Sequence, residues 1–222
     1  MRRKNLFQIV EIFAIVILFG ICNSCNNSNY EEEVDEILEK TGVKGGLVVH
    51  LGVENGKLTT ALHTNDQYLI HGLAKDKETA DKARDYIHQQ GLYGEVTIEQ
   101  WNGTNLPYTD NLVNLLIAEN LGKISMDEVM RVLSPQGVAY IKEDGEWKKT
   151  VKPRPGNTDE WTHYLHGPSN NAVAQDTKVG PLHNLQWKAK PLFSRSHELI
   201  PSIRSLVSAK GRIFYTMDEA PA

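Results

Sequence analysis

The residues best placed to do chemistry form a short glycine-rich turn. Gly52 and Gly56 follow an apolar, β-branched run and precede residues with helical spacing, which predicts a strand, a tight turn and the start of a helix. Such a turn can place backbone N–H groups against a nucleotide. Glu54 stands in the middle of the turn, where the close approach of a ligand favours glycine. The turn therefore predicts a cofactor site in which the Glu54 side chain would hinder the approach of the ligand.

Histidines are the other residues that invite a chemical interpretation. His163 and His166 are three positions apart, but no third residue with suitable spacing lies near them. We therefore predict aromatic packing for this pair and no metal site. His50 and His71 lie within apolar strands, so we expect both to be hydrogen-bonded core residues. The spacing of residues assigns no catalytic base.

Strand-like and helix-like segments alternate around the turn. Strands are expected at 47–51, 68–73, 95–100, 112–118, 138–142 and 147–151, and helices at 30–40, 57–63, 77–90 and 125–133. Asp76 can cap one helix, the Ser125–Glu128 segment is a capping box for another, and Asp144-Gly145 predicts a hairpin turn. A turn is expected at 135–137. The fold class that follows is α/β, a Rossmann-like, doubly wound, mostly parallel sheet.

In this order, the segments of residues 46–143 resemble a class I S-adenosylmethionine-dependent methyltransferase domain. Gly52–Gly56 occupies the place of that family's glycine-rich loop, Tyr68–Ala74 its second strand and Leu112–Ala118 its fourth strand. Glu128–Gly137 is similar to the family's helix followed by leucine, proline and glycine. The resemblance implies S-adenosylmethionine as cofactor.

The resemblance also implies which residues would bind the donor. The positions are Gly52, Glu54, Gly56 and Ala74. The family usually has an acidic residue just before the loop and a glycine in its middle, where this chain has His50 and Glu54. It also has an acidic residue at the end of the second strand that binds both ribose hydroxyls. Ala74 occupies that position here, with Asp76 as a displaced substitute. A lost bond to a charged acceptor costs about 1.5–3 kcal/mol. A Glu54 carboxylate about 4 Å from the ligand's carboxylate would add about 4 kcal/mol at an effective dielectric constant of about 20, and much less if it turned outward.

Three interpretations of this domain follow. The fold has been retained after donor binding weakened, and it acts as a binding or scaffolding module; or it is an active methyltransferase of unknown acceptor, which relies on proximity rather than on a base; or it is an unrelated Rossmann-like domain. The loop Trp101–Asp110 would border the adenine side of a ligand, or it is a polar connection in which Trp101 packs on the sheet edge.

The N-terminus has the layout of an export signal. Arg2, Arg3 and Lys4 precede the apolar run Ile12–Ile21, which is about half the roughly 20 residues that a membrane-spanning helix requires. Ser24-Cys25 followed by asparagines resembles a lipoprotein cleavage site with Cys25 as the lipidated residue. Residues 1–25 are thus a signal peptide of lipoprotein or simply cleaved type, or a retained anchor. We expect an exported protein, anchored to the membrane or periplasmic, without a disulfide in the mature domain.

Residues 152–222 follow a different pattern from 26–151. After a linker at 152–156, the segment Asp159–Asn171, with Gly180-Pro181 and Leu185–Trp187, resembles the stretch that leads into the first blade of pyrroloquinoline-quinone (PQQ) β-propellers, and Ser205–Thr216 resembles a blade hairpin. A propeller needs several blades, so this piece is incomplete and PQQ is not expected in it. The resemblance leaves open that the chain is a fragment of a quinone-dependent oxidoreductase.

Charge separates the same two regions. The chain has 222 residues, 40% of them hydrophobic and 23% charged. Residues 26–150 have 12 Lys and Arg against 21 Asp and Glu, a net charge of −9, whereas residues 151–222 have 9 against 6, a net charge of +3. An acidic main domain argues against a nucleic-acid partner, because phosphate binding needs a basic face.

Overall fold

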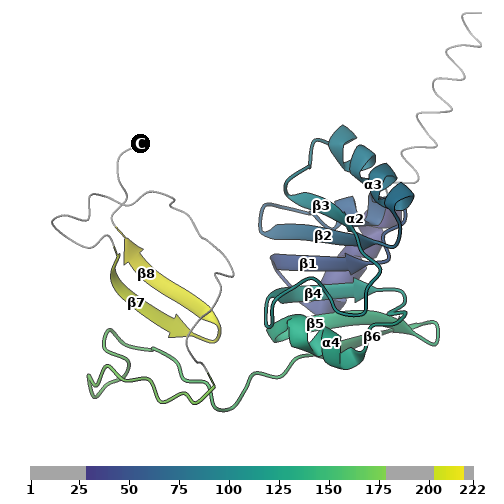
Figure 1. Cartoon of the computed structure of the whole chain (residues 1–222). Coiled ribbons are helices and arrows are strands. Elements are labelled where there is room, and N and C mark those ends of the chain that lie inside the picture. The colour runs from purple at the N-terminus through teal and green to yellow at the C-terminus, as the bar shows by residue number, and fades with distance from the viewer. Residues whose placement is uncertain (1–28, 179–202, 218–222) are drawn as a thin grey trace, which may run out of the picture. The chain divides into compact units, whose positions relative to one another are not determined.

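The computed structural model describes residues 29–178 and 203–217 (Figure 1). The predictions for residues 1–25, Cys25 included, and for the positions from 180 to 202 lie outside these residues. The chain divides after Lys152 into two units, which are described separately. Among the described helices, none combines the length and the apolar character needed to cross a membrane.

The first unit is built on a six-stranded sheet (Figure 1). Its strands are β1 (Gly46–Leu51), β2 (Tyr68–Ala74), β3 (Val96–Gln100), β4 (Val113–Ala118), β5 (Leu133–Glu143) and β6 (Glu146–Val151). Their order is β3-β2-β1-β4-β5-β6, and every neighbouring pair is parallel except β5 with β6. This order confirms the predicted Rossmann-like, mostly parallel α/β fold.

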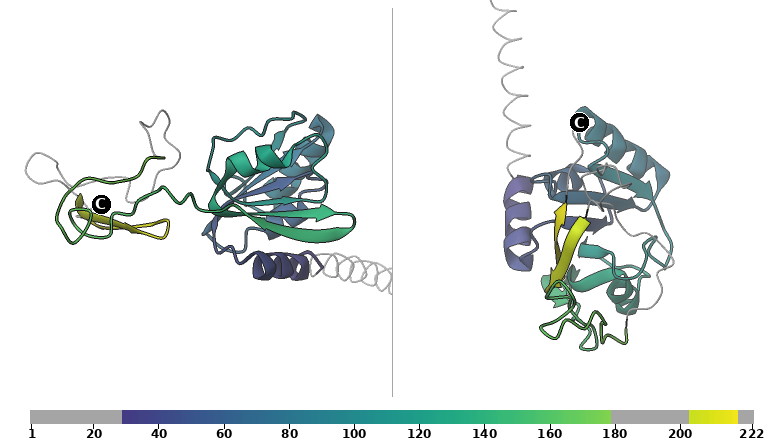
Figure 2. Two further views of the ribbon diagram at one scale, coloured as in Figure 1. Left: turned by 90° about the horizontal axis from the view of Figure 1, so that it is seen from below. Right: turned by 90° about the vertical axis from the view of Figure 1, so that its left-hand side faces the viewer.

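Helices cover both faces of the sheet (Figure 2). One face packs against a helix over residues 29–41, here named the N-terminal helix, and against α2 (Lys57–Ala61) and α3 (Lys77–Gln89); its core includes Val34, Ile37, Ala80, Ala83 and Ile87. The other face packs against α4 (Met126–Val132) and the loop after β3; its core includes Leu106, Val129 and Val132. The apolar spacing of these helices predicted which of their sides is buried.

Local signals fix several element ends. Asp76 accepts a hydrogen bond from the N–H of Thr79 at 2.9 Å and so caps α3, as predicted. Asp144 and Gly145 have φ of 54° and 85°, which suits the tight hairpin turn between β5 and β6. Both features were expected from the sequence.

The predicted turn at 135–137 is wrong. β5 already begins at Leu133, and Gln136, with φ of 67°, lies in a bulge within the strand. The reason is pairing with the segment after β6: the N–H of Gln136 donates to the carbonyl of Lys152 at 2.8 Å, and the N–H of Lys152 donates to Gly137 at 2.9 Å. These long-range bonds continue the ladder across a sequence that resembles a turn.

The second unit contains an antiparallel hairpin of β7 (Ile203–Ala209) and β8 (Arg212–Met217). Lys210 and Gly211 form its turn with φ of 51° and 76°, which confirms the hairpin expected at 205–216. The N–H of Trp161 donates to Ser208 Oγ at 2.8 Å, so the segment that contains Trp161 is joined to the hairpin. The relation of this unit to a propeller stays a prediction.

Candidate functional site

A cavity lies at the carboxyl ends of the parallel strands. It has a volume of about 600 Å³, and we name it the edge cavity. Its lining residues come from the ends of β1, β2, β3 and β4: Leu51, Gly52, Leu73, Lys75, Trp101, Asn102, Gly103 and residues 120–124. The strand order reverses between β1 and β4, and open α/β sheets bind ligands in the crevice at such a reversal.

The first two backbone N–H groups of the glycine turn form hydrogen bonds with the sheet. Gly52 has φ of 80°, a conformation that L side chains rarely adopt. The N–H groups of Gly52 and Val53 both donate to the carbonyl of Leu73, at 3.0 and 3.1 Å. These two N–H groups are therefore occupied by β2 and do not point to a ligand.

The last glycine of the turn serves packing. Gly56 has φ of 77°, and a Cβ there would lie 3.1 Å from the carbonyl oxygen of Ala83 in α3. The N–H of Lys57, the first residue of α2, donates to Asn55 Oδ1 at 2.9 Å. The turn between β1 and α2 is thus held by contacts within the protein.

Glu54 lines a different cavity, of about 170 Å³, which shares Gly52 with the edge cavity. We name it the acidic cavity, because three carboxylates, Glu33, Glu54 and Glu119, line it together with Tyr30 and His50. Burial and the negative charge of Glu119 raise the pKa of Glu33. Glu54 is exposed and does not line the edge cavity, so its carboxylate lies where other negative charges gather.

His50 is a buried, neutral histidine. Its side chain is 6% exposed, and its Nδ1 lies 2.9 Å from the Thr59 hydroxyl. Burial lowers its pKa to about 4, so the ring is uncharged at pH 7. His71 Nδ1 lies 2.8 Å from the Tyr108 hydroxyl. Both histidines are hydrogen-bonded within the fold, but only His50 is buried as predicted; His71 is partly exposed.

Ala74 lies outside both cavities. It is fully buried in the core on the face of α3, whereas Leu73 belongs to the core on the other face. Because side chains alternate along a strand, Lys75 follows Leu73 and lines the edge cavity. Asp76 is occupied as the cap of α3. At the end of β2 a lysine therefore lines the cavity. The alternation of side chains along the strand is the sequence signal that points to Lys75.

Trp101 both packs on the sheet and borders the edge cavity. Its backbone N–H donates to the carbonyl of Ala74 at 2.8 Å, and its half-buried ring packs against the core beside α4. A Cβ on Gly103 would lie 3.2 Å from the ring atom Cζ2. Trp101 therefore fits both interpretations of this loop, as a residue that packs on the sheet and as one that borders a ligand site.

An ion-pair network holds the same loop to α4. Arg131 pairs with Asp110 and Glu128, both at 2.7 Å, and donates to the carbonyl of Tyr108 at 2.9 Å. The carboxylate of Glu128 also accepts from the N–H of Leu106 at 2.6 Å. Ser125 Oγ accepts from the N–H of Glu128 at 3.2 Å, but Glu128 is turned to Arg131. Only half of the predicted capping box is therefore present.

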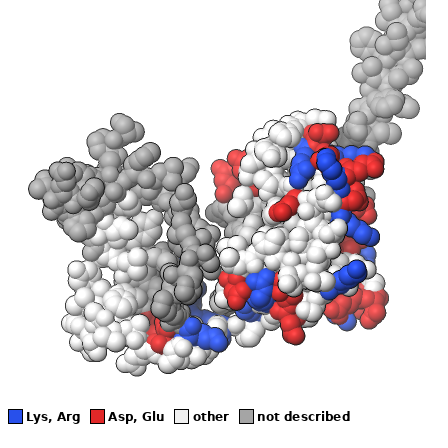
Figure 3. All heavy atoms as spheres, viewed as in Figure 1, with Lys and Arg blue, Asp and Glu red and all other residues white. Residues whose placement is uncertain are grey.

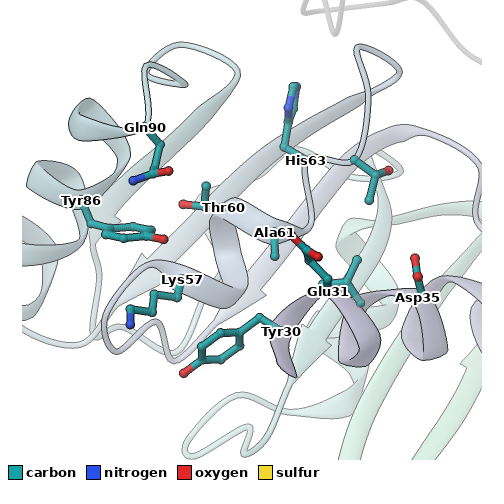
Figure 4. Close-up of a pocket in the computed structure, with 11 residues that line it drawn as sticks. Tyr30, Glu31, Asp35, Lys57, Thr60, Ala61, His63, Tyr86 and Gln90 are labelled. Atoms are coloured by element: carbon teal, nitrogen blue, oxygen red, sulfur yellow. The ribbon is translucent and has the colours of Figure 1, made fainter. Parts of the chain in front are cut away.

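A third cavity, of about 430 Å³, lies among the N-terminal helix, α2 and α3 (Figure 4). Tyr30, Lys57, Thr60, Tyr86 and Gln90 are among its lining residues. No strand end contributes to it, so it lies apart from the crevice that the strand order predicts. We assign the candidate site to the edge cavity.

Of the histidine pair His163 and His166 in the second unit, His166 makes the predicted aromatic contact, whereas His163 Nδ1 lies 2.9 Å from the Thr162 hydroxyl. His166 Nε2 lies 2.6 Å from Asp159 Oδ2, and its ring meets that of Trp161 edge-on with the centroids 5.3 Å apart. Among the described residues, no three His, Cys, Asp or Glu side chains are grouped so that they could hold a metal ion.

Solved structures of methyltransferases are similar to the first unit. No protein-family model and no curated protein sequence matches the chain. A putative S-adenosyl-L-methionine-dependent methyltransferase from Methanococcus maripaludis has 24% identity and a TM-score of 0.46 over 50% of this chain and 54% of its own. A putative sarcosine dimethylglycine methyltransferase from Galdieria sulphuraria has 24% identity and a TM-score of 0.45 over 50% and 45%.

Geranyl diphosphate C-methyltransferase from Streptomyces coelicolor, solved with S-adenosyl-L-homocysteine, has 15% identity and a TM-score of 0.45 over 50% of this chain and 44% of its own. The chain thus spans about half the length of these proteins. The fold assignment rests on the strand order and registers given above.

Proposed function

We propose that the first unit is an S-adenosylmethionine-dependent methyltransferase-like domain that binds the methyl donor weakly and acts as a binding or scaffolding module. The strand order and the glycine turn support the fold part of the proposal. The observation that supports weak donor binding is the charge of the edge cavity: within the part of the chain that the structure describes, Lys75 and Lys123 line it and no Asp or Glu does.

Electrostatic repulsion is the physical reason for weak donor binding. S-adenosylmethionine has a sulfonium and an ammonium against one carboxylate, so its net charge is positive. A lysine about 8 Å from that charge costs about 2 kcal/mol at an effective dielectric constant of about 20, and less when solvent screens it. The missing carboxylate on the ribose hydroxyls costs about 1.5–3 kcal/mol more. The sum predicts a loss of at least a hundredfold in donor affinity.

An active methyltransferase is the second candidate. The volume of the edge cavity, about 600 Å³, lies within the range of about 300–1,000 Å³ typical of small-molecule sites. Methyl transfer can proceed by orientation alone, without an assigned base. In this case the two lysines would have to turn away from the ligand.

Calorimetric titration of the full chain with S-adenosylmethionine separates the two candidates. We expect no heat of binding up to millimolar donor. A dissociation constant in the micromolar range would contradict the proposal and favour the enzyme. A functional methyltransferase titrated in the same buffer is the positive control.

We also propose that the protein is exported and held at a membrane through Cys25, and that residues 152–222 are the start of a PQQ-like propeller fused to the domain. The sequence of the first 29 residues and the Trp- and Asn-containing stretch at 159–171 support these two points. Export would remove the domain from the compartment where the methyl donor is made, which agrees with a binding role.

A further inference from the structure

We propose that the edge cavity binds a nucleotide anion, a planar base with a phosphate, in preference to any cationic ligand. This inference rests on the proposed function, because it names the ligand of the binding module. Three properties of the cavity support it: its charge, its aromatic wall and the position of the nearby carboxylates.

The charge of the lining is positive. Among the described residues, its charged lining consists of Lys75, after β2, and Lys123, in the loop between β4 and α4. Neither has a carboxylate within 4.0 Å among the residues that the structure describes, whereas Lys40, Lys77, Lys82 and Lys148 do. Two ammonium groups on different segments beside one cavity favour an anion, and an ammonium binds phosphate as a point charge.

The aromatic wall is Trp101. Contacts with Gly103 and with the core beside α4 position its indole ring, and within the described part of the chain its Nε1–H has no hydrogen-bond partner at the cavity. Purine and pyrimidine bases stack on such rings. A base stacked on Trp101 in a cavity that two lysines also line is the chemistry of a nucleotide rather than of a bare phosphate.

The side-chain amide of Asn120 and the carboxylates of the neighbouring acidic cavity would orient the bound nucleotide. Asn120 Oδ1 accepts from the N–H of Gly122 at 2.6 Å, which leaves its NH2 group to donate to a sugar hydroxyl. The carboxylates of Glu33, Glu54 and Glu119 line the acidic cavity and not the edge cavity. An anion therefore meets repulsion on the side of the acidic cavity and attraction at Lys75 and Lys123.

Calorimetry of the full chain with four probes tests the inference. The probes are AMP, adenosine, inorganic phosphate and S-adenosylmethionine. We expect AMP to bind at least tenfold tighter than adenosine or phosphate alone. The Lys75→Glu, Lys123→Glu double variant should lose at least tenfold in AMP affinity, with circular dichroism as the check on folding. Lys44→Glu is the matched control, since Lys44 is exposed before β1, at the opposite edge of the sheet, and should leave AMP affinity unchanged.

Two results would overturn the inference: AMP binding no tighter than adenosine, or equal AMP affinities of the double variant and the wild type. The S-adenosylmethionine arm reports on the proposed function separately. Micromolar donor binding beside tight AMP binding would refute weak donor binding only. No heat of binding with any of the four probes would refute the nucleotide inference only.

Discussion

In the proposed function, the residue at the end of β2 decides which ligand the edge cavity can hold. Lys75 lines the cavity, whereas Ala74 is fully buried in the core. We expect Lys75→Asp to lower the dissociation constant for S-adenosylmethionine at least tenfold, because it removes a repulsive charge and offers an acceptor to the ribose. Titration calorimetry measures this gain.

Ala74→Asp is the matched comparison. It places the same carboxylate one position earlier, inside the core, where an unpaired charge costs several kcal/mol. We expect no gain in donor binding and a loss of about 2–4 kcal/mol in the free energy of unfolding, measured in urea. Donor binding gained by Ala74→Asp and not by Lys75→Asp would show that the cavity is assigned to the wrong side chain.

His50 makes stability depend on pH. Its pKa is about 4 in the folded protein because of burial, below the ordinary value of about 6.5 in the unfolded chain. The unfolded state therefore takes up the proton first, so stability is complete above about pH 6.5 and falls as pH drops towards 4. The loss due to this group is about 3 kcal/mol.

The His50→Asn variant isolates that contribution. Asparagine does not titrate, and its side chain can still meet the Thr59 hydroxyl, which His50 contacts at 2.9 Å. Urea unfolding at pH 7 and pH 4.5 should show a smaller loss of stability in the variant than in the wild type. Equal losses in both proteins would contradict the assignment.

At the scale of elements, the loop after β3 depends on α4. Arg131 joins Glu128, Asp110 and the carbonyl of Tyr108. We expect Arg131→Ala to lower the free energy of unfolding by about 2–3 kcal/mol, because hydrogen bonds to charged groups are lost and Glu128 keeps an unpaired charge. Lys148→Ala, which breaks the exposed pair with Glu143, should cost no more than about 1 kcal/mol. Similar losses in the two variants would refute the role of the network.

The elements themselves could be predicted from sequence where the signals are local. Asp76 and Gly91 bracket α3, and its buried alanines follow helical spacing. The bulge at Gln136 could not be predicted, because its hydrogen bonds come from Lys152. The hydrogen bond that Glu128 accepts from the N–H of Leu106 could not be predicted either, because Leu106 lies in the loop after β3 and not in α4.

At the scale of the whole molecule, topology assembles the site. Gly52 could be identified from the glycine pattern, but Lys75, Trp101 and Lys123 follow three different strands and meet only because parallel strands end at one edge. Their convergence could be inferred only after the strand order was known. The placement of Ala74 also depends on the strand, because one step along it changes the face and Leu73 and Ala74 belong to opposite cores.

Basic and acidic side chains are mixed on the described surface of the first unit and do not form the broad basic face that binds nucleic acid. Figure 3 shows basic and acidic side chains interspersed among the described residues on the face in view. A local pair of lysines at the edge cavity is compatible with a small anion, whereas binding along a nucleic-acid backbone needs a broad basic surface.

Attachment to a membrane is a property of the whole chain. If Cys25 is the lipidated residue, metabolic labelling with palmitate in a bacterial host should mark the wild type, and Cys25→Ala should remove the label. Cys22→Ala is the control and should keep it. Label that persists in Cys25→Ala would contradict lipid attachment at this position.

The most direct test of the central claim, that the edge cavity accepts a nucleotide anion and excludes the methyl donor, is the indole N–H resonance of Trp101 in the NMR spectrum, assigned through Trp101→Phe. We predict that AMP shifts this resonance in a saturable manner, whereas S-adenosylmethionine at the same concentrations leaves it in place. A saturable shift with S-adenosylmethionine and none with AMP would contradict the account.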